Sequence, residues 1–235
     1  MLRRRQWIAS LAALSGAALL PRSARAAQTK VLLLGDSMIA GGFGLFLARD
    51  LEREHGYLTE RRGKSSTGLA RPDFYDWIEE GAAARAAFEP DAVVCMFGGN
   101  DGQGLYMGRD QWIRYGEAGW DEEYRRRIHF FADAVTAGGE WLFWVGMPPM
   151  RLERLHTRVA HMNELYREAL AIRPSARFLD IWSVLADDEG NYADHLEYAG
   201  KRERVRAGDG IHLNAAGSRL LADAVRPRIS QLLGQ

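Results

Sequence analysis

The sequence has a single cysteine and no apolar run long enough to cross a membrane. That cysteine, Cys95, lies in the apolar stretch 92–97 and has no second thiol to pair with. A disulfide framework, a CxxC zinc site and a lipid-attached cysteine are therefore excluded. A membrane-spanning helix needs about 20 apolar residues, whereas the apolar run 7–20 is shorter and is diluted by serine and glycine.

The N-terminal segment predicts a signal peptide. Arg3, Arg4 and Arg5 precede the run 7–20, and a small-residue site ending at Ala26 follows it, in the order positive, apolar, cleavable. The arginine pair before Trp7 resembles a twin-arginine signal, with an ordinary secretory signal as the alternative. We therefore expect export, to the periplasm if the source is a Gram-negative bacterium, and one domain over 27–235.

No excess of positive charge is left after residue 26. The first 26 residues carry five arginines and no acid, which leaves 26 basic and 31 acidic side chains in the remainder. This balance argues against a nucleic-acid partner.

Apolar runs of strand length alternate with segments of helical period, which predicts an α/β fold. We expect a single-domain α/β/α sandwich built on a mostly parallel, five-stranded, flavodoxin-like sheet. The predicted strands lie at about 30–34, 58–62, 92–97, 140–145 and 177–179, and the predicted helices at about 73–87, 121–137, 151–172 and 215–233. Two long connections, 101–120 and 182–208, are candidates for functional loops.

Three polar clusters lie at loop positions where an open parallel sheet binds its ligands, beyond the carboxyl ends of strands. Ser37 follows the first strand, where it is also an ordinary helix N-cap candidate. Gly98-Gly99-Asn100-Asp101 follows the third strand and is also typical of a turn. Near the C-terminus, Asp209 stands three residues before His212, where a carboxylate could orient the imidazole.

Together the clusters supply a nucleophile, a base, an orienting carboxylate and an oxyanion donor, which is the set that a serine hydrolase needs. The segments VLLLGDSM, FGGND and DGIHL, in that order, resemble the first, third and fifth sequence blocks of the SGNH/GDSL hydrolases. Met147-Pro148-Pro149 also resembles the superfamily, and the likeness spans nearly all of residues 27–235.

The resemblance implies roles for individual residues. Ser37 would be the nucleophile, His212 the general base and then acid, and Asp209 the residue that orients His212. The oxyanion hole would combine the Ser37 N–H, the Asn100 side-chain amide and the N–H of Gly68, which we prefer to Gly63 because it lies further beyond the second strand. The resemblance implies no metal and no organic cofactor.

The implied activity is hydrolysis of a small-acyl ester, such as an acetyl ester, of a cell-envelope glycan such as a polysaccharide or peptidoglycan. Tyr106, Trp112 and Arg71 are candidates for substrate contacts. The alternative is that the aromatic rings pack on their own domain and that the arginine pairs with a nearby acid.

Three other functions compete with ester hydrolysis. An acyltransferase would use the same triad. A metal-dependent phosphohydrolase would gather magnesium on Asp36, Asp101 and Asp209, although the paired Asp-x-Asp of such sites is missing after the first strand. A non-catalytic glycan-binding domain would keep only the fold.

Overall fold

The computed structural model describes residues 28–234. The predicted signal peptide lies outside the described residues. Within them, no helix is both long enough and apolar enough to span a membrane.

Five parallel strands form the central sheet, in the order β2-β1-β3-β6-β7. They are β1 (Lys30–Gly35), β2 (Leu58–Gly63), β3 (Ala92–Met96), β6 (Trp141–Val145) and β7 (Ala176–Leu179). All five predicted strands are present, within a residue or two, and the order is that of flavodoxin-like sheets. The predicted fold class is confirmed.

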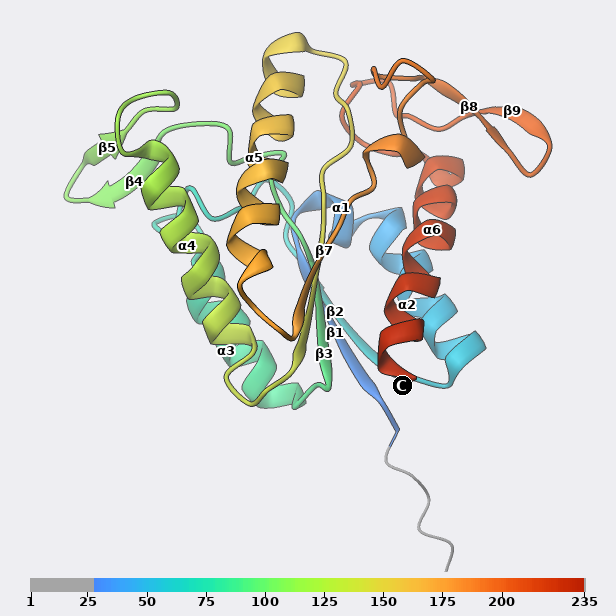
Figure 1. Cartoon of the computed structure of the whole chain (residues 1–235), viewed down its shortest axis with the longest axis horizontal. Coiled ribbons are helices and arrows are strands. Elements are labelled where there is room, and N and C mark those ends of the chain that lie inside the picture. Colours follow the sequence, from blue (N-terminus) through green and yellow to red (C-terminus); the bar gives the residue numbers. More distant parts are fainter. Residues whose placement is uncertain (1–27, 235) are drawn as a thin grey trace, which may run out of the picture.

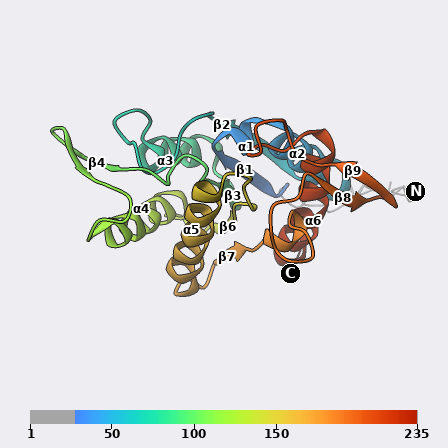
Figure 2. The ribbon, with the colours of Figure 1, turned by 90° about the horizontal axis from the view of Figure 1, so that it is seen from above.

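Helices cover both faces of the sheet (Figures 1 and 2). One face carries the helices α1 (Ser37–Ala40), α2 (Gly42–His55) and α6 (Ala215–Leu233), and the other carries α3 (Trp77–Phe88), α4 (Trp120–Val135) and α5 (Glu153–Ala171). The strands β1, β3 and β6 are almost fully buried between these layers, which explains why they read as continuous apolar runs.

The structure differs from the predicted helices in two places. Helix α3 starts at Trp77 rather than at 73, because the Asp76 carboxylate accepts from the N–H groups of Ile78 and Glu79 and so caps the helix there. Helix α2 was not predicted, because Gly42 and Gly44 at its start are typical of loops. Both glycines instead permit close packing, since a Cβ on Gly44 would lie 2.1 Å from the Ile39 carbonyl oxygen.

The two long connections each contain a β-hairpin. The first hairpin pairs β4 (Leu105–Gly108) with β5 (Gln111–Ile113), and the second pairs β8 (His195–Tyr198) with β9 (Lys201–Arg204). A short 3-10 helix, η1 (Trp182–Val184), begins the second connection. Both hairpins project from the end of the molecule where the parallel strands terminate (Figure 1).

Candidate active site

Ser37 is placed by a sharp turn at the end of β1. It is the first residue of α1, and the N-cap is Asp36, whose carboxylate accepts from the Met38 N–H at 2.9 Å. Ser37 is therefore not the N-cap of its helix, and its hydroxyl is free for other contacts. The N–H of a residue at this position has no acceptor within the helix, so it too is available to a ligand.

Ser37, His212 and Asp209 form one hydrogen-bonded chain. The Ser37 Oγ lies 2.7 Å from His212 Nε2, and His212 Nδ1 lies 2.6 Å from Asp209 Oδ2. With the imidazole proton on Nδ1, Ser37 donates to Nε2 and the ring donates to Asp209. The nucleophile and its base are 175 positions apart in the sequence, so only the fold brings them together.

Asp209 is held ionised by its hydrogen bonds. Partial burial alone would raise its pKa, but the contacts from the His212 ring and from the N–H groups of Ile211 and His212 outweigh burial and lower the pKa to about 2. An ionised Asp209 fixes the His212 tautomer and stabilises the imidazolium that forms during proton transfer.

Two arginines fasten the loop that carries Asp209 and His212. Arg151 donates to the Gly208 carbonyl at 2.7 Å, and its N–H donates to the Gly210 carbonyl. Arg206 is fully buried and donates to the carbonyls of Ile211 and Pro149. Burial lowers the pKa of Arg206 to about 10, although the charges of Asp194 and Asp209 oppose that fall. Pro149 belongs to the Met147-Pro148-Pro149 motif, so this motif supports the loop that carries Asp209 and His212.

Asn100 lies beside the loop that contains Gly68. Its Nδ2 donates to the Thr67 carbonyl at 3.0 Å. A primary amide has two N–H donors, so this bond orients the side chain and leaves the second N–H for a ligand. The contact places Asn100 next to Gly68, whereas Gly63 packs against α1, where a Cβ would lie 2.3 Å from the Ala40 nitrogen.

Asp101, named in the sequence only within the Asn100 motif and as a ligand of the phosphohydrolase alternative, connects the Asn100 loop with the loop that contains Gly68. It is fully buried and accepts from the Leu69 N–H at 3.0 Å, the Ala70 N–H at 2.8 Å and the Tyr124 hydroxyl at 2.8 Å. Burial raises its pKa, and these donors together with the Arg127 charge oppose that rise. A Cβ on Gly68 would lie 2.1 Å from Asp101 Oδ1, so only glycine fits at position 68.

The carboxylates of the phosphohydrolase alternative are committed to other contacts. The Asp101 oxygens accept from Leu69, Ala70 and Tyr124, and the Asp209 oxygens from His212 and Ile211. In residues 28–234, no group of three or more His, Cys, Asp or Glu side chains is arranged to hold a metal ion.

The three candidates for substrate contacts, Arg71, Tyr106 and Trp112, lie together at the β4–β5 hairpin. The Arg71 guanidinium is 4.9 Å from the centre of the Trp112 ring, and the Tyr106 ring meets Trp112 edge-on at 5.2 Å. Arg71 also pairs with Asp73 through two hydrogen bonds. Trp112 remains 42% exposed, so part of its ring is open to a ligand.

A cavity of about 380 Å³ lies between this hairpin, α3 and α4. Gly68, Leu69 and Tyr106 line it, but Ser37, Asn100 and His212 do not. The cavity therefore borders the loop that contains Gly68, but it does not contain the triad.

Comparison with known proteins fits this geometry. Residues 30–228 match the family model described as "Protein of unknown function (DUF459)". The chain belongs to the DUF459 family. This family is SGNH-like, in agreement with the resemblance seen in the sequence. No curated protein sequence matches the DUF459 chain.

Solved structures of SGNH-type proteins share the fold of this DUF459 protein. A carbohydrate esterase family 3 protein from Talaromyces cellulolyticus superposes with a TM-score of 0.60 at 15% identity, covering 88% of this chain and 99% of that one. A protein described as an SGNH hydrolase from Slackia heliotrinireducens gives 0.56 at 20% identity, with 86% and 99% covered. A GDSL-like lipase from Bacteroides thetaiotaomicron gives 0.58 at 14% identity, with 87% and 89% covered.

Proposed function

We propose that this DUF459 protein is a serine hydrolase that cleaves carboxylic esters through an acyl-enzyme on Ser37. The observation that carries the proposal is the unbroken hydrogen-bonded chain from the Ser37 hydroxyl through His212 to the ionised Asp209. Structural likeness to an esterase and a lipase supports the same reaction class.

The reaction has two halves. In the first, His212 Nε2 takes the Ser37 proton while Oγ attacks the ester carbonyl, and the imidazolium then protonates the leaving alcohol as the acyl-enzyme forms. In the second, His212 takes a proton from water, the hydroxide attacks the acyl carbon, and Ser37 leaves with the proton returned from His212. The acid and the alcohol are released separately.

Negative charge builds on the former carbonyl oxygen in both halves. Three donors are available to it: the Ser37 N–H at the start of α1, the second N–H of Asn100, and the Gly68 N–H. Removing one donor from such a hole typically costs about 10²- to 10³-fold in turnover.

The direct test is hydrolysis of p-nitrophenyl acetate by the purified protein and its variants, with EDTA in a parallel reaction. Ser37→Ala should lose the enzymatic rate, and Asn100→Ala should keep a rate about 10²- to 10³-fold below wild type. EDTA should change neither result. Activity that survives Ser37→Ala but disappears with EDTA would replace the triad with a metal site.

For the natural substrate, we propose a small-acyl ester, such as an acetyl ester, of a cell-envelope glycan. The carbohydrate esterase among the structural neighbours and the predicted export support this class. Isolated envelope polysaccharide should release acetate with the wild-type protein and none with Ser37→Ala. Activity confined to long-chain lipid esters would contradict the glycan assignment.

A further inference from the structure

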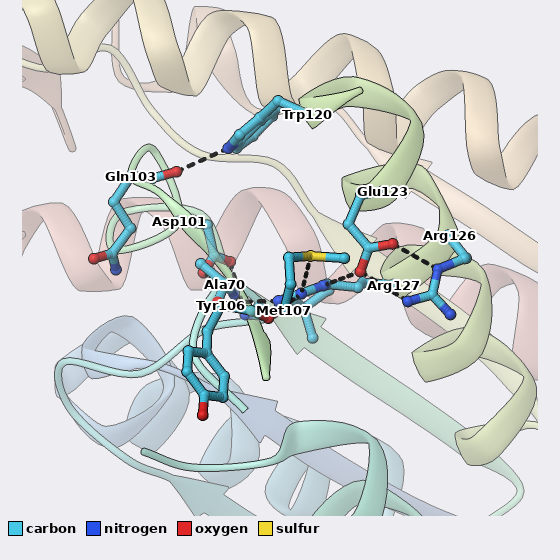
Figure 3. Close-up of polar contacts among 10 residues, drawn as sticks. Ala70, Asp101, Gln103, Tyr106, Met107, Trp120, Glu123, Arg126 and Arg127 are labelled. Carbon is cyan, nitrogen blue, oxygen red and sulfur yellow. Dashed lines mark hydrogen bonds and ion pairs between the residues drawn. The ribbon is translucent and has the colours of Figure 1, made fainter. Parts of the chain in front are cut away.

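The backbone groups of Leu69 and Ala70, the two residues that follow Gly68, are hydrogen-bonded by the buried side chains of Asp101 and Arg127. Figure 3 shows Ala70 beside these two side chains. The Asp101 carboxylate accepts from the N–H groups of Leu69 and Ala70. On the carbonyl side, Nη1 of Arg127 donates to the Leu69 oxygen at 2.8 Å and to the Ala70 oxygen at 3.0 Å. Every backbone donor and acceptor of these two residues is therefore bound by a charged side chain.

Arg127 is itself fixed by its neighbours. Its Nε donates to Glu123, one turn earlier on α4, at 2.7 Å, and its Nη2 donates to the Tyr106 carbonyl at 2.5 Å. Arg127 is 6% exposed and Glu123 is 7% exposed. A buried ion pair is tolerated when hydrogen bonds satisfy the charged groups, and the rigid guanidinium fork serves several acceptors in one geometry.

These hydrogen bonds matter for the reaction because the same loop positions two of the three proposed oxyanion donors, the Gly68 N–H and the Asn100 amide. Gly68 directly precedes Leu69 and packs against Asp101. The Thr67 carbonyl orients the Asn100 amide. A shift of residues 69–70 would displace the Gly68 N–H and the Thr67 carbonyl together.

We propose that Arg127 is a positioning residue of the oxyanion hole: from helix α4 it holds residues 67–70 at the distance that the developing oxyanion requires, without touching substrate. The proposal rests on the serine hydrolase function proposed above. It assigns a catalytic contribution to a residue that lies outside the three sequence motifs.

The neighbouring Arg126 provides a matched control. It also binds Glu123, through two hydrogen bonds. Its side chain is 52% exposed, and none of its hydrogen bonds goes to the loop. Replacing Arg126 removes an arginine of the same helix that binds the same carboxylate, but leaves the hydrogen bonds from Arg127 to Leu69 and Ala70 in place.

The experiment measures kcat and KM for p-nitrophenyl acetate, together with the inhibition constant of phenylboronic acid, whose serine adduct places an oxygen in the oxyanion hole. A misplacement of about 1 Å in a catalytic group costs up to about 10²-fold. For Arg127→Met we expect kcat to fall about 10- to 100-fold with KM within about twofold, and boronate binding to weaken by a similar factor. Arg127→Lys should recover part of the loss, and Arg126→Met should match wild type.

Three outcomes would overturn the proposal: a folded Arg127→Met with wild-type kcat, an equal loss in Arg126→Met, or a loss that appears only in KM. If Arg127→Met does not fold, Arg127→Lys carries the test, and wild-type kcat in that variant counts against the proposal. The wild-type and Ser37→Ala rates are measured beside these variants. If the wild-type protein does not hydrolyse the ester, or if Ser37→Ala hydrolyses it as fast, the hydrolase function is rejected. If only the Arg127 variants depart from the expected result, only the positioning role of Arg127 is rejected.

Discussion

Among single residues, two carboxylates of the site, Asp36 and Asp209, have opposite environments. Asp209 accepts three hydrogen bonds and stays ionised, with its pKa lowered to about 2. Asp36 is 1% exposed, and its pKa is raised to about 7. Burial is the main cause of that rise, Asp101 adds to it, and the Met38 N–H, His212 and the Gly99 N–H oppose it. Two acids near one nucleophile therefore ionise in different pH ranges.

The raised pKa of Asp36 predicts a pH dependence of stability. In the folded protein Asp36 binds a proton up to about pH 7, whereas in the unfolded chain it loses that proton near its ordinary pKa of 3.8. Its contribution to stability is therefore complete below about pH 4 and is lost as the pH rises through 7. The difference of about three units corresponds to at most roughly 4 kcal/mol.

Asp36→Asn removes this titration and keeps an oxygen that can accept from the Met38 N–H. Urea unfolding between pH 4 and 8 should show that wild-type stability falls relative to the variant across this range. If the difference between the two proteins is constant with pH, Asp36 does not titrate as the structure indicates.

Two glycines near the site, Gly68 and Gly208, differ in the space around them. Gly68→Ala should lower kcat by about 10²-fold or more, since its Cβ would collide with Asp101 and displace an oxyanion donor. Gly208→Ala, next to Asp209, meets no atom within 4 Å and should retain wild-type activity. Steady-state kinetics with thermal melting of both variants checks this, and equal activities would remove Gly68 from the oxyanion hole.

At the scale of elements, the sequence predicted the parts that have a strong local signal. Buried parallel strands are continuous apolar runs, and the motifs of Ser37 and Asn100 lie in the loops that follow β1 and β3. The hairpins and α2 lacked such a signal. Helix α2 is stabilised by packing against α6, where a Cβ on Gly42 would lie 2.7 Å from Ser218 Oγ, and this contact joins distant parts of the chain.

The same reason explains which site residues were missed. The hydrogen bond from Arg127 to Leu69 spans 58 positions, and that from Ala70 to Asp101 spans 31. Helical spacing puts Arg127, three residues after Tyr124 and four before Phe131, on the buried face of α4, but this spacing does not show which distant carbonyl groups its guanidinium binds. Ser37, Asn100, Asp209 and His212 could be nominated because they lie in short motifs, but the arginines that hold their loops could not.

The β4–β5 hairpin is the element that we expect to bind the glycan. Trp112 is exposed and lies beside Arg71 and Tyr106, and aromatic faces suit sugar rings. Trp112→Ala should therefore raise KM for acetylated polysaccharide several-fold and leave p-nitrophenyl acetate kinetics unchanged. Equal effects on both substrates would show that the hairpin supports the fold rather than glycan binding.

At the scale of the whole molecule, the sheet order explains how distant motifs meet. Strand β1 lies between β2 and β3, so the chain turns to opposite sides of the sheet after β1 and after β3, and the crevice opens at this switch point. Ser37 and Asn100 follow these two neighbouring strands. Helix α6 packs against α2, and the loop before α6 brings His212 within hydrogen-bond distance of Ser37.

The most direct test of this account is the intact mass of the protein after reaction with diethyl p-nitrophenyl phosphate, which phosphorylates activated serines. We predict one diethylphosphoryl group per wild-type chain, located on Ser37 by peptide mapping, and none on Ser37→Ala or His212→Ala under the same conditions. An unmodified wild-type protein that still hydrolyses esters, or a label on another residue, would contradict the assignment of Ser37 as the nucleophile.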